Sequence, residues 1–159
     1  MRQKRVKDLM IPLEDYPHVP HWFTLRQAMA IVREAAIKFE GNFEPRALLV
    51  FDEKYRLMGI LTLLDIVKGL EPESKEEADL IDQDFIVSLF DLHFEAKAQR
   101  PVSELMSSIQ VTVDGDAPIA RALQLMVKEN VVRIPVMADQ RVIGMIRLGD
   151  LFNEMAQVL

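Results

Sequence analysis

The sequence predicts an α+β fold made of two similar halves with a helical connector between them. Two repeated features carry this prediction. A Leu-Met motif ends residues 6–10 (Val-Lys-Asp-Leu-Met) and residues 102–106 (Val-Ser-Glu-Leu-Met). Each half then reads helix, strand, strand, helix, and the last strand and helix of each half meet in similar stretches, residues 59–65 and 144–150. Internal repetition of this kind indicates that one supersecondary unit occurs twice.

The first helix of each half is predicted by apolar residues at three- and four-residue spacing, which share one helical face. In the first half these residues are Leu25, Ala28, Met29, Val32, Ala35, Ala36 and Phe39. In the second half they are Ile119, Ala122, Leu123, Met126 and Val127. Both patterns are typical of a helix that buries one side.

A hairpin follows each helix, because two short apolar runs flank a polar turn. The paired runs are residues 47–51 with 57–61, and residues 132–137 with 142–146. A short closing helix is predicted after each hairpin, over residues 65–70 and 150–155.

The connector begins after residues 71–74 (Glu-Pro-Glu-Ser), which indicate a helix stop and a boundary. Residues 75–99 are predicted to be helical and carry more large apolar side chains than a flexible linker would. These are Leu80, Ile81, Phe85, Ile86, Leu89, Phe90, Leu92 and Phe94. They pack either against the body of this protein or against a partner, and the sequence leaves both open. The predicted domains are residues 1–70, 71–100 and 101–159.

Composition disfavours several classes of protein. The chain has 159 residues, no cysteine and a formal charge of −6. Without cysteine there are no disulfides and no thiolate metal sites, and the acidic balance disfavours nucleic-acid binding. No apolar run reaches the ~18 residues of a membrane span, and no apolar signal region follows the basic start. We therefore expect a cytoplasmic protein that binds neither nucleic acid nor membrane.

The order of elements and the repeated motifs resemble the CBS-domain pair, or Bateman module. The resemblance rests on the two Leu-Met motifs, on residues 134–136 (Ile-Pro-Val), and on residues 59–65 and 144–150. In these two stretches the family has Gly, two apolar residues, Thr or Ser, two variable residues and Asp. The first copy matches fully, whereas the second has Arg147 in place of the hydroxyl residue. The resemblance implies two tandem β-α-β-β-α repeats, packed through their sheets with pseudo-two-fold symmetry.

In function, the resemblance implies a regulatory module rather than an enzyme. Clefts between such repeats commonly bind AMP, ADP, ATP or S-adenosylmethionine, and the modules often form homodimers that regulate a separate protein. We expect such a ligand here, no required cofactor, and a regulated partner that the sequence does not identify. The alternative is a dimerisation or interaction scaffold whose clefts bind nothing. No nucleophile triad, phosphate-cradling glycine loop or metal signature favours catalysis.

The resemblance assigns ligand binding first to Asp65 and Thr62. An ionised carboxylate has only acceptor oxygens and can hold the two hydroxyls of a ribose. In the family the Asp holds the ribose, and the hydroxyl residue supports the ribose or the phosphate. A purely structural role is equally compatible with the spacing, because Thr-x-x-Asp is close to a helix capping box.

The remaining candidates follow by resemblance from both halves. Ile60 from the same repeat, with Met106, Val111 and Val131, would line the Asp65 cleft, and core packing is the alternative for all four. Asp150 stands where the second ribose carboxylate would be. Arg133 and Arg147 are candidates for binding phosphate, although Arg133 could equally be a solvated arginine at a strand end.

Arg147 has two further possibilities. It could fill the second cleft, or it could pair with Asp150 and abolish binding there.

Residues 12–23 depart from the short start that the family has at this place. They include Asp15, Tyr16, His18, His21 and Trp22, which raises the question of a metal site. The spacing matches no closed ligand set, since zinc takes three or four protein ligands. We expect a loop with surface histidines and no metal.

Overall fold

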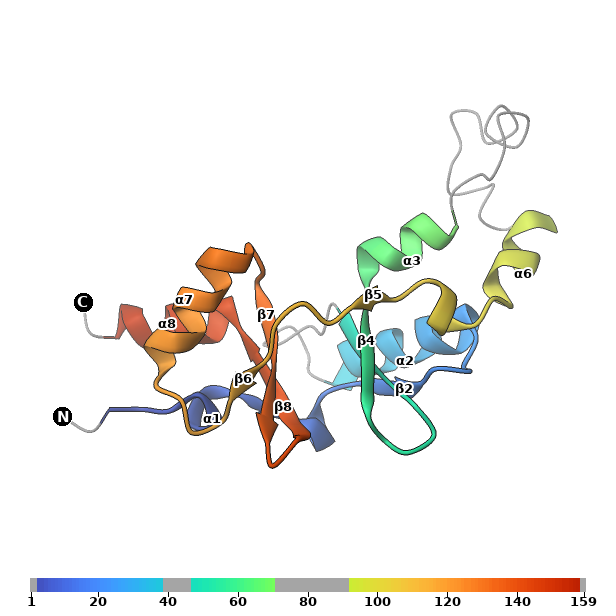
Figure 1. Cartoon of the computed structure of the whole chain (residues 1–159). Coiled ribbons are helices and arrows are strands. Elements are labelled where there is room, and N and C mark those ends of the chain that lie inside the picture. Colours follow the sequence, from blue (N-terminus) through green and yellow to red (C-terminus); the bar gives the residue numbers. More distant parts are fainter. Residues whose placement is uncertain (1–2, 39–46, 71–91, 158–159) are drawn as a thin grey trace. The chain divides into compact units, whose positions relative to one another are not determined.

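The computed structural model describes residues 3–38, 47–70 and 92–157 (Figure 1). The chain forms two compact units. One, the central unit, is Pro17–Ser108, and the other, the terminal unit, combines Met1–Tyr16 with Ile109–Leu159. Each unit has helices and one four-stranded sheet, which confirms the predicted α+β class.

The central unit runs through β2 (His18–Pro20), α2 (Leu25–Lys38), β3 (Ala47–Phe51), β4 (Leu57–Thr62) and α3 (Leu63–Gly69). It ends with α6 (Leu92–Ala98), the 3₁₀ turn η2 (Val102–Glu104) and β5 (Ser107–Ser108). Its sheet has the order β2-β3-β4-β5, in which β2 lies parallel to β3 and the other neighbours are antiparallel.

The terminal unit repeats this arrangement. Its repeat consists of β6 (Val113–Asp114), α7 (Ile119–Glu129), β7 (Arg133–Ala138), β8 (Arg141–Arg147) and α8 (Leu148–Ala156). The start of the chain adds α1 (Val6–Leu9), β1 (Ile11–Pro12) and the 3₁₀ turn η1 (Leu13–Asp15). The sheet order is β1-β8-β7-β6, with β6 parallel to β7. Both units therefore contain the predicted β-α-β-β-α repeat.

The two hairpins match in register as well as in order. Val50 pairs with Gly59 in the central unit, and Val136 pairs with Gly144 in the terminal unit. In both hairpins the register shifts immediately after this pair. Thr62 and Arg147 are consequently equivalent positions, each the last residue of a strand and the N-cap of the following helix. The closing helices begin at Leu63 and Leu148, two residues before the predicted starts.

The Leu-Met motifs do not fold against the repeats that they precede in the sequence. Strand β1, which follows Met10, pairs with β8, and strand β5, which follows Met106, pairs with β4. The compact units therefore combine each repeat with the Leu-Met segment that precedes the other repeat. The division into residues 1–70, 71–100 and 101–159 follows the repeats along the sequence and stays a prediction. Sequence adjacency alone does not indicate this exchange, because the strand pairings are long-range.

Two glycines make the exchanged strands possible. A Cβ at Gly59 would lie 2.7 Å from both the Met106 Sδ and the Ser107 carbonyl oxygen. A Cβ at Gly144 would lie 2.8 Å from the Met10 Sδ and closer still to the Ile11 carbonyl oxygen. Each Leu-Met motif thus places its methionine sulfur over the glycine of the strand that it joins. The same contact between the two motifs therefore occurs in both units.

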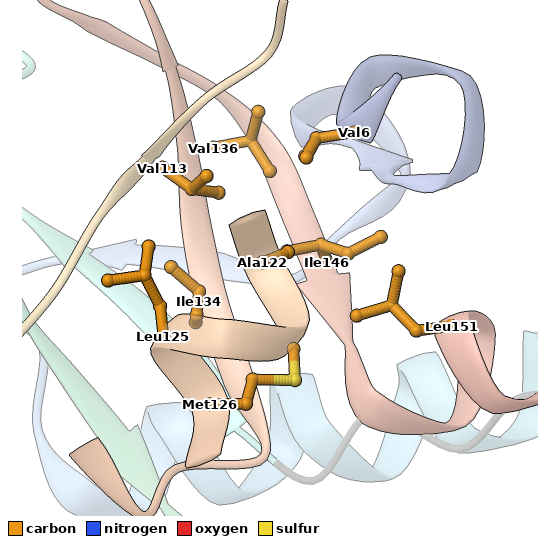
Figure 2. Packing of buried hydrophobic residues seen from close by; sticks show 9 residues of the cluster. All are labelled: Val6, Val113, Ala122, Leu125, Met126, Ile134, Val136, Ile146 and Leu151. Carbon is orange, nitrogen blue, oxygen red and sulfur yellow. The ribbon is translucent and has the colours of Figure 1, made fainter. Parts of the chain in front are cut away.

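Each unit has its own hydrophobic core. In the terminal unit, Figure 2 shows side chains from α1, β6, α7, β7, β8 and α8 converging between the helices and the sheet. This cluster comprises Val6, Val113, Ala122, Leu125, Met126, Ile134, Val136, Ile146 and Leu151. The central unit has a corresponding cluster of Val19, Leu25, Ala28, Leu48, Val50, Leu61, Ile66, Leu70 and Val102. Val6 and Val102, the first residues of the two Leu-Met motifs, are each fully buried.

The described end of the connector is helical, as predicted. Phe94 on α6 packs against the core cluster of the central unit, and the guanidinium of Arg26 lies 5.8 Å from the centre of its ring. Arg26 also forms an ion pair with Glu95. These contacts favour packing within the protein at this end of the connector. The apolar residues from Leu80 to Phe90 lie outside the described residues.

The prediction of a loop for residues 12–23 was wrong in part. The segment contains η1 and β2, and Val19 of β2 is 1% exposed and pairs with Val50. A three-residue strand is too short to show an alternating pattern, and its parallel partner is about thirty residues away in the chain. None of the described helices is long and apolar enough to cross a membrane.

Candidate functional site

The junction between β4 and α3 holds Thr62 and Asp65 in a closed capping box. The backbone N–H of Asp65 donates to the Thr62 Oγ at 3.1 Å, and the backbone N–H of Thr62 donates to the Asp65 Oδ2 at 2.9 Å. The structural role that the sequence left open is therefore present. The cap leaves other acceptor positions of the Asp65 carboxylate available, because it uses one position on one of the two oxygens.

Asp65 has a further partner that the sequence reasoning missed. The Ser107 hydroxyl donates to the Asp65 Oδ1 at 3.0 Å and lies 3.2 Å from the Oδ2. Ser107 comes from β5, where it pairs with Ile60. The only available signal was its place directly after Leu-Met, and its approach to Asp65 depends on the exchanged strand.

The partners that the structure gives Asp65 are neutral donors: a backbone amide and a hydroxyl. Within the described part of the chain, no arginine, lysine or histidine forms an ion pair with this carboxylate. Asp65 is half-buried, and Ser107 beside it is exposed. The arrangement is a partly shielded carboxylate whose charge is not neutralised by a described cationic side chain, next to the hydroxyl of an exposed serine.

The equivalent junction between β8 and α8 has different chemistry. Arg147 donates from Nε to the Asp150 Oδ2 at 3.0 Å and from Nη2 to the Oδ1 at 2.7 Å. The Arg147 backbone N–H also lies 3.3 Å from the Oδ2. Both carboxylate oxygens are thus bound by a guanidinium in the bidentate geometry that arginine favours. Of the possibilities that the sequence left open for Arg147, the structure shows pairing with Asp150.

Arg133 and Tyr16 complete the surroundings of this ion pair. Arg133 is the register partner of Arg147 across the hairpin, so the two residues lie on the same face of the sheet. Burial raises the pKa of Tyr16 to about 12, while the charges of Arg133 and Arg147 act in the opposite direction and that of Asp150 adds to the rise. The charges of Arg133, Arg147 and Asp150 all act on the Tyr16 phenol, but its burial is the largest effect.

The other predicted lining residues are divided between the units. Ile60 and Met106 lie in the central unit near Asp65, Ile60 as the register partner of Ser107 and Met106 against Gly59 and the core cluster. Val111 and Val131 lie in the terminal unit, where both pack against its core cluster. A packing role is therefore present for Met106, Val111 and Val131. Their part in a ligand site remains a prediction.

The histidines of residues 12–23 contact the β3–β4 turn. The His18 Nε2 is 2.7 Å from the Tyr55 hydroxyl, and the His21 Nε2 is 3.1 Å from the Glu53 Oε2. No group of three or more histidine or acidic side chains in residues 3–38, 47–70 and 92–157 is arranged to hold a metal ion. These side chains tie β2 to the turn of the neighbouring hairpin.

Several solved structures that match this fold are described as CBS-domain proteins. The CBS domain of a CBS domain containing membrane protein from Sphaerobacter thermophilus has a TM-score of 0.73 at 22% identity, over 96% of this chain and 88% of that one. CBSX2 in complex with AMP has a TM-score of 0.68 at 20% identity, over 98% of each chain.

A third match is the CBS domain pair of protein MJ0100, solved with 5′-methylthioadenosine and S-adenosyl-L-methionine. It has a TM-score of 0.66 at 22% identity, over 99% of this chain and 100% of that one. No curated protein matches the sequence. The family model for the CBS domain matches residues 6–72 and again residues 102–157. The chain therefore belongs to the CBS-domain family, as a tandem pair of repeats.

Proposed function

We propose that this protein is a regulatory module that binds an adenine nucleotide or S-adenosylmethionine through Asp65. The observation that carries the proposal is the un-neutralised carboxylate of Asp65, held by the Thr62 amide and the Ser107 hydroxyl. We also propose that the bound ligand acts through self-association, as a homodimer, or through a separate regulated protein in the cytoplasm.

The chemistry of the carboxylate suits a ribose. A vicinal diol has two O–H donors, and an ionised carboxylate has two oxygens with about four acceptor positions between them. The Thr62 amide occupies one of these positions, and the Ser107 hydroxyl can turn away to act as an acceptor instead. A ribose can therefore bind without any change in the backbone of the cap. Each charge-assisted hydrogen bond of this kind contributes about 1.5–3 kcal/mol.

The ligands of the similar structures share the group that this site would recognise. AMP in CBSX2, and 5′-methylthioadenosine and S-adenosyl-L-methionine in protein MJ0100, are all adenosine derivatives. They differ in what is attached at the 5′ position and agree in the ribose diol. This agreement supports an adenosine ligand for the present chain. In our proposal, Ile60, Met106, Val111 and Val131 supply apolar contacts to it.

The second candidate function is a scaffold that binds no ligand. The Arg147–Asp150 ion pair favours it, because the guanidinium binds both oxygens of the second carboxylate and neutralises its charge. This alternative predicts that adenine ligands change neither the stability nor the oligomeric state of the protein.

A thermal-shift panel with AMP, ADP, ATP, GTP and S-adenosylmethionine tests the proposal. A ligand at 100 times its dissociation constant adds about 2.7 kcal/mol to the stability of the folded state. We expect a rise in the melting temperature with at least one adenine ligand and a much smaller rise in Asp65→Asn. If no ligand shifts the melting temperature at millimolar concentration, the scaffold becomes the better account.

Asp8→Asn is the matched control for this panel. Asp8 accepts a hydrogen bond from the Arg5 backbone N–H at 2.8 Å, at the same helical position that Asp65 has relative to Thr62. Both substitutions keep an oxygen that can accept from the cap and remove one negative charge. We expect the ligand response of Asp8→Asn to equal that of the unmodified protein. An equal loss of response in both variants would point to a general effect of weakened caps.

A further inference from the structure

The two repeats place an aspartate at equivalent backbone positions. Asp65 and Asp150 are each the third residue of the helix that follows the last strand, and each accepts a hydrogen bond from the N-cap backbone amide, at 2.9 Å and 3.3 Å. The N-cap residues Thr62 and Arg147 also face equivalent partners, Ala47 and Arg133, across their hairpins. Differences between the junctions therefore arise from side chains and not from the fold.

Those side chains give the two carboxylates different partners: uncharged donors at Asp65 and a charged guanidinium at Asp150. Asp65 contacts neutral donors, and the nearest one from the exchanged strand is the hydroxyl of Ser107. The residue equivalent to Ser107 in the terminal unit is Ile11, which pairs with Met145 and offers no hydroxyl. Asp150 instead has both oxygens bound by Arg147.

The Arg147–Asp150 pair is difficult for the uncharged hydroxyls of a ribose to open. Its side chains are only 27% and 18% exposed, so solvent screens the charges less than at the surface. The two residues are three positions apart in one helical turn, so little additional conformational entropy is lost when the pair forms. A ribose hydroxyl carries no charge, so in place of the guanidinium it would leave the Asp150 carboxylate without the positive charge and the bidentate geometry that Arg147 supplies.

We propose that Arg147 closes the second adenosine site, so that each chain binds a single ligand, at Asp65. This inference rests on the proposed function of Asp65 and assigns a specificity-determining role to Arg147. Arg147→Thr opens the Asp150 carboxylate. The new threonine also recreates the Thr-x-x-Asp capping box seen at Thr62, so the variant is expected to fold.

Titration calorimetry with AMP and with S-adenosylmethionine tests this assignment. For the unmodified protein we expect a single ligand per chain and an affinity that is unchanged within about twofold in Asp150→Asn, whereas Asp65→Asn weakens binding about tenfold or more. Arg147→Thr should bind a second ligand. Arg141→Thr, a change of the same type at an exposed position of the same strand, should leave the stoichiometry unchanged.

The outcomes separate the two proposals. Two ligands per unmodified chain, or a loss of affinity in Asp150→Asn as large as that in Asp65→Asn, would overturn the closure by Arg147. A single ligand in both the unmodified protein and a folded Arg147→Thr would overturn it as well. Binding by Arg147→Thr alone would support the closure and refute the role of Asp65. Absence of binding in every variant would refute both.

Discussion

Replacing Gly59 with alanine tests the explanation given for the paired Gly and Leu-Met motifs. The added Cβ would lie 2.7 Å from the Ser107 carbonyl oxygen and 2.7 Å from the Met106 Sδ, below the 3.0 Å that real Cβ contacts respect. The methionine end can rotate, but the carbonyl belongs to the backbone of β5, which must retreat by about 0.3 Å or more. This movement strains the pairing of β5 with β4.

The expected cost follows from two opposing effects. Overpacking of this kind costs about 1–3 kcal/mol, whereas replacing glycine with alanine gains about 0.5–1 kcal/mol through the unfolded chain. We therefore expect Gly59→Ala to lower the free energy of unfolding by up to about 2.5 kcal/mol. At about 2–4 °C per kcal/mol for a chain of this size, the melting temperature falls by up to about 10 °C.

Gly149→Ala is the matched control, since nothing lies within 4 Å of a Cβ at that position. Gly149 is in the first turn of α8, where alanine is the better helix former by about 1 kcal/mol. The same substitution should thus raise stability at Gly149 and lower it at Gly59. Urea and thermal unfolding followed by circular dichroism measure both. A Gly59→Ala variant that gains as much stability as Gly149→Ala would refute the close approach of β5.

Three further predictions concern the core, the surface charges and one helix end. Leu151→Ala should cost about 2–5 kcal/mol in urea unfolding because this side chain is fully buried, whereas Phe152→Ala next to it, 63% exposed in the native protein, should change stability by less than about 0.5 kcal/mol. The hydrogen bond and the charge of Lys7 hold the pKa of Asp116 below its usual range. The ionised Asp116 carboxylate therefore stabilises the folded protein at pH values above the pKa that Asp116 has in the unfolded chain, and this stabilisation is lost as the pH falls through its pKa in the folded protein. Asp116→Asn should accordingly lower the melting temperature at pH 7 and leave it unchanged at pH 2, and an equal difference at both pH values would contradict this. Asn130 ends α7 with φ 54° and ψ 49°, so Asn130→Ala should cost about 1 kcal/mol while Asn130→Gly should be nearly neutral, and equal losses in thermal unfolding would argue against the left-handed cap.

Much of the fold was predictable because each helix and strand of the repeat occurs in two sequence copies, which can be compared. The hairpins of the two halves support each other, and the same holds for the helices that begin at Leu25 and Ile119. The closing helices were predicted two residues late. Their starts at Leu63 and Leu148 follow from the caps at Thr62 and Arg147, which hydrophobic periodicity does not mark.

The exchange of the Leu-Met segments was not predictable from local pattern. A two-residue strand such as β1 or β5 has no periodicity of its own, and its partner is set by packing at Gly144 or Gly59. Ser107 was missed for the same reason, since its importance depends on the strand that it joins. Long-range pairing is where sequence reasoning on a single chain is weakest.

At the candidate site, the sequence identified the functional side chains but not the hydrogen bonds and ion pairs that they form. Thr62 and Asp65 form the capping box that was one of the two interpretations, and the Asp65 carboxylate keeps free acceptor positions for the other. For Arg147 several rotamers were compatible with the sequence. The ion pair with Asp150 is a property of the folded helix start, where the two side chains come within 2.7 Å.

The measurement that tests the central claim most directly compares AMP with 2′-deoxy-AMP by titration calorimetry, in the unmodified protein and in Asp65→Asn. If Asp65 holds the ribose diol, loss of one hydroxyl removes a charge-assisted hydrogen bond of about 1.5 kcal/mol or more, which weakens binding about tenfold. Our account predicts this discrimination in the unmodified protein and its disappearance in Asp65→Asn. Equal affinity of the unmodified protein for both nucleotides would contradict it, and so would full discrimination that survives the substitution.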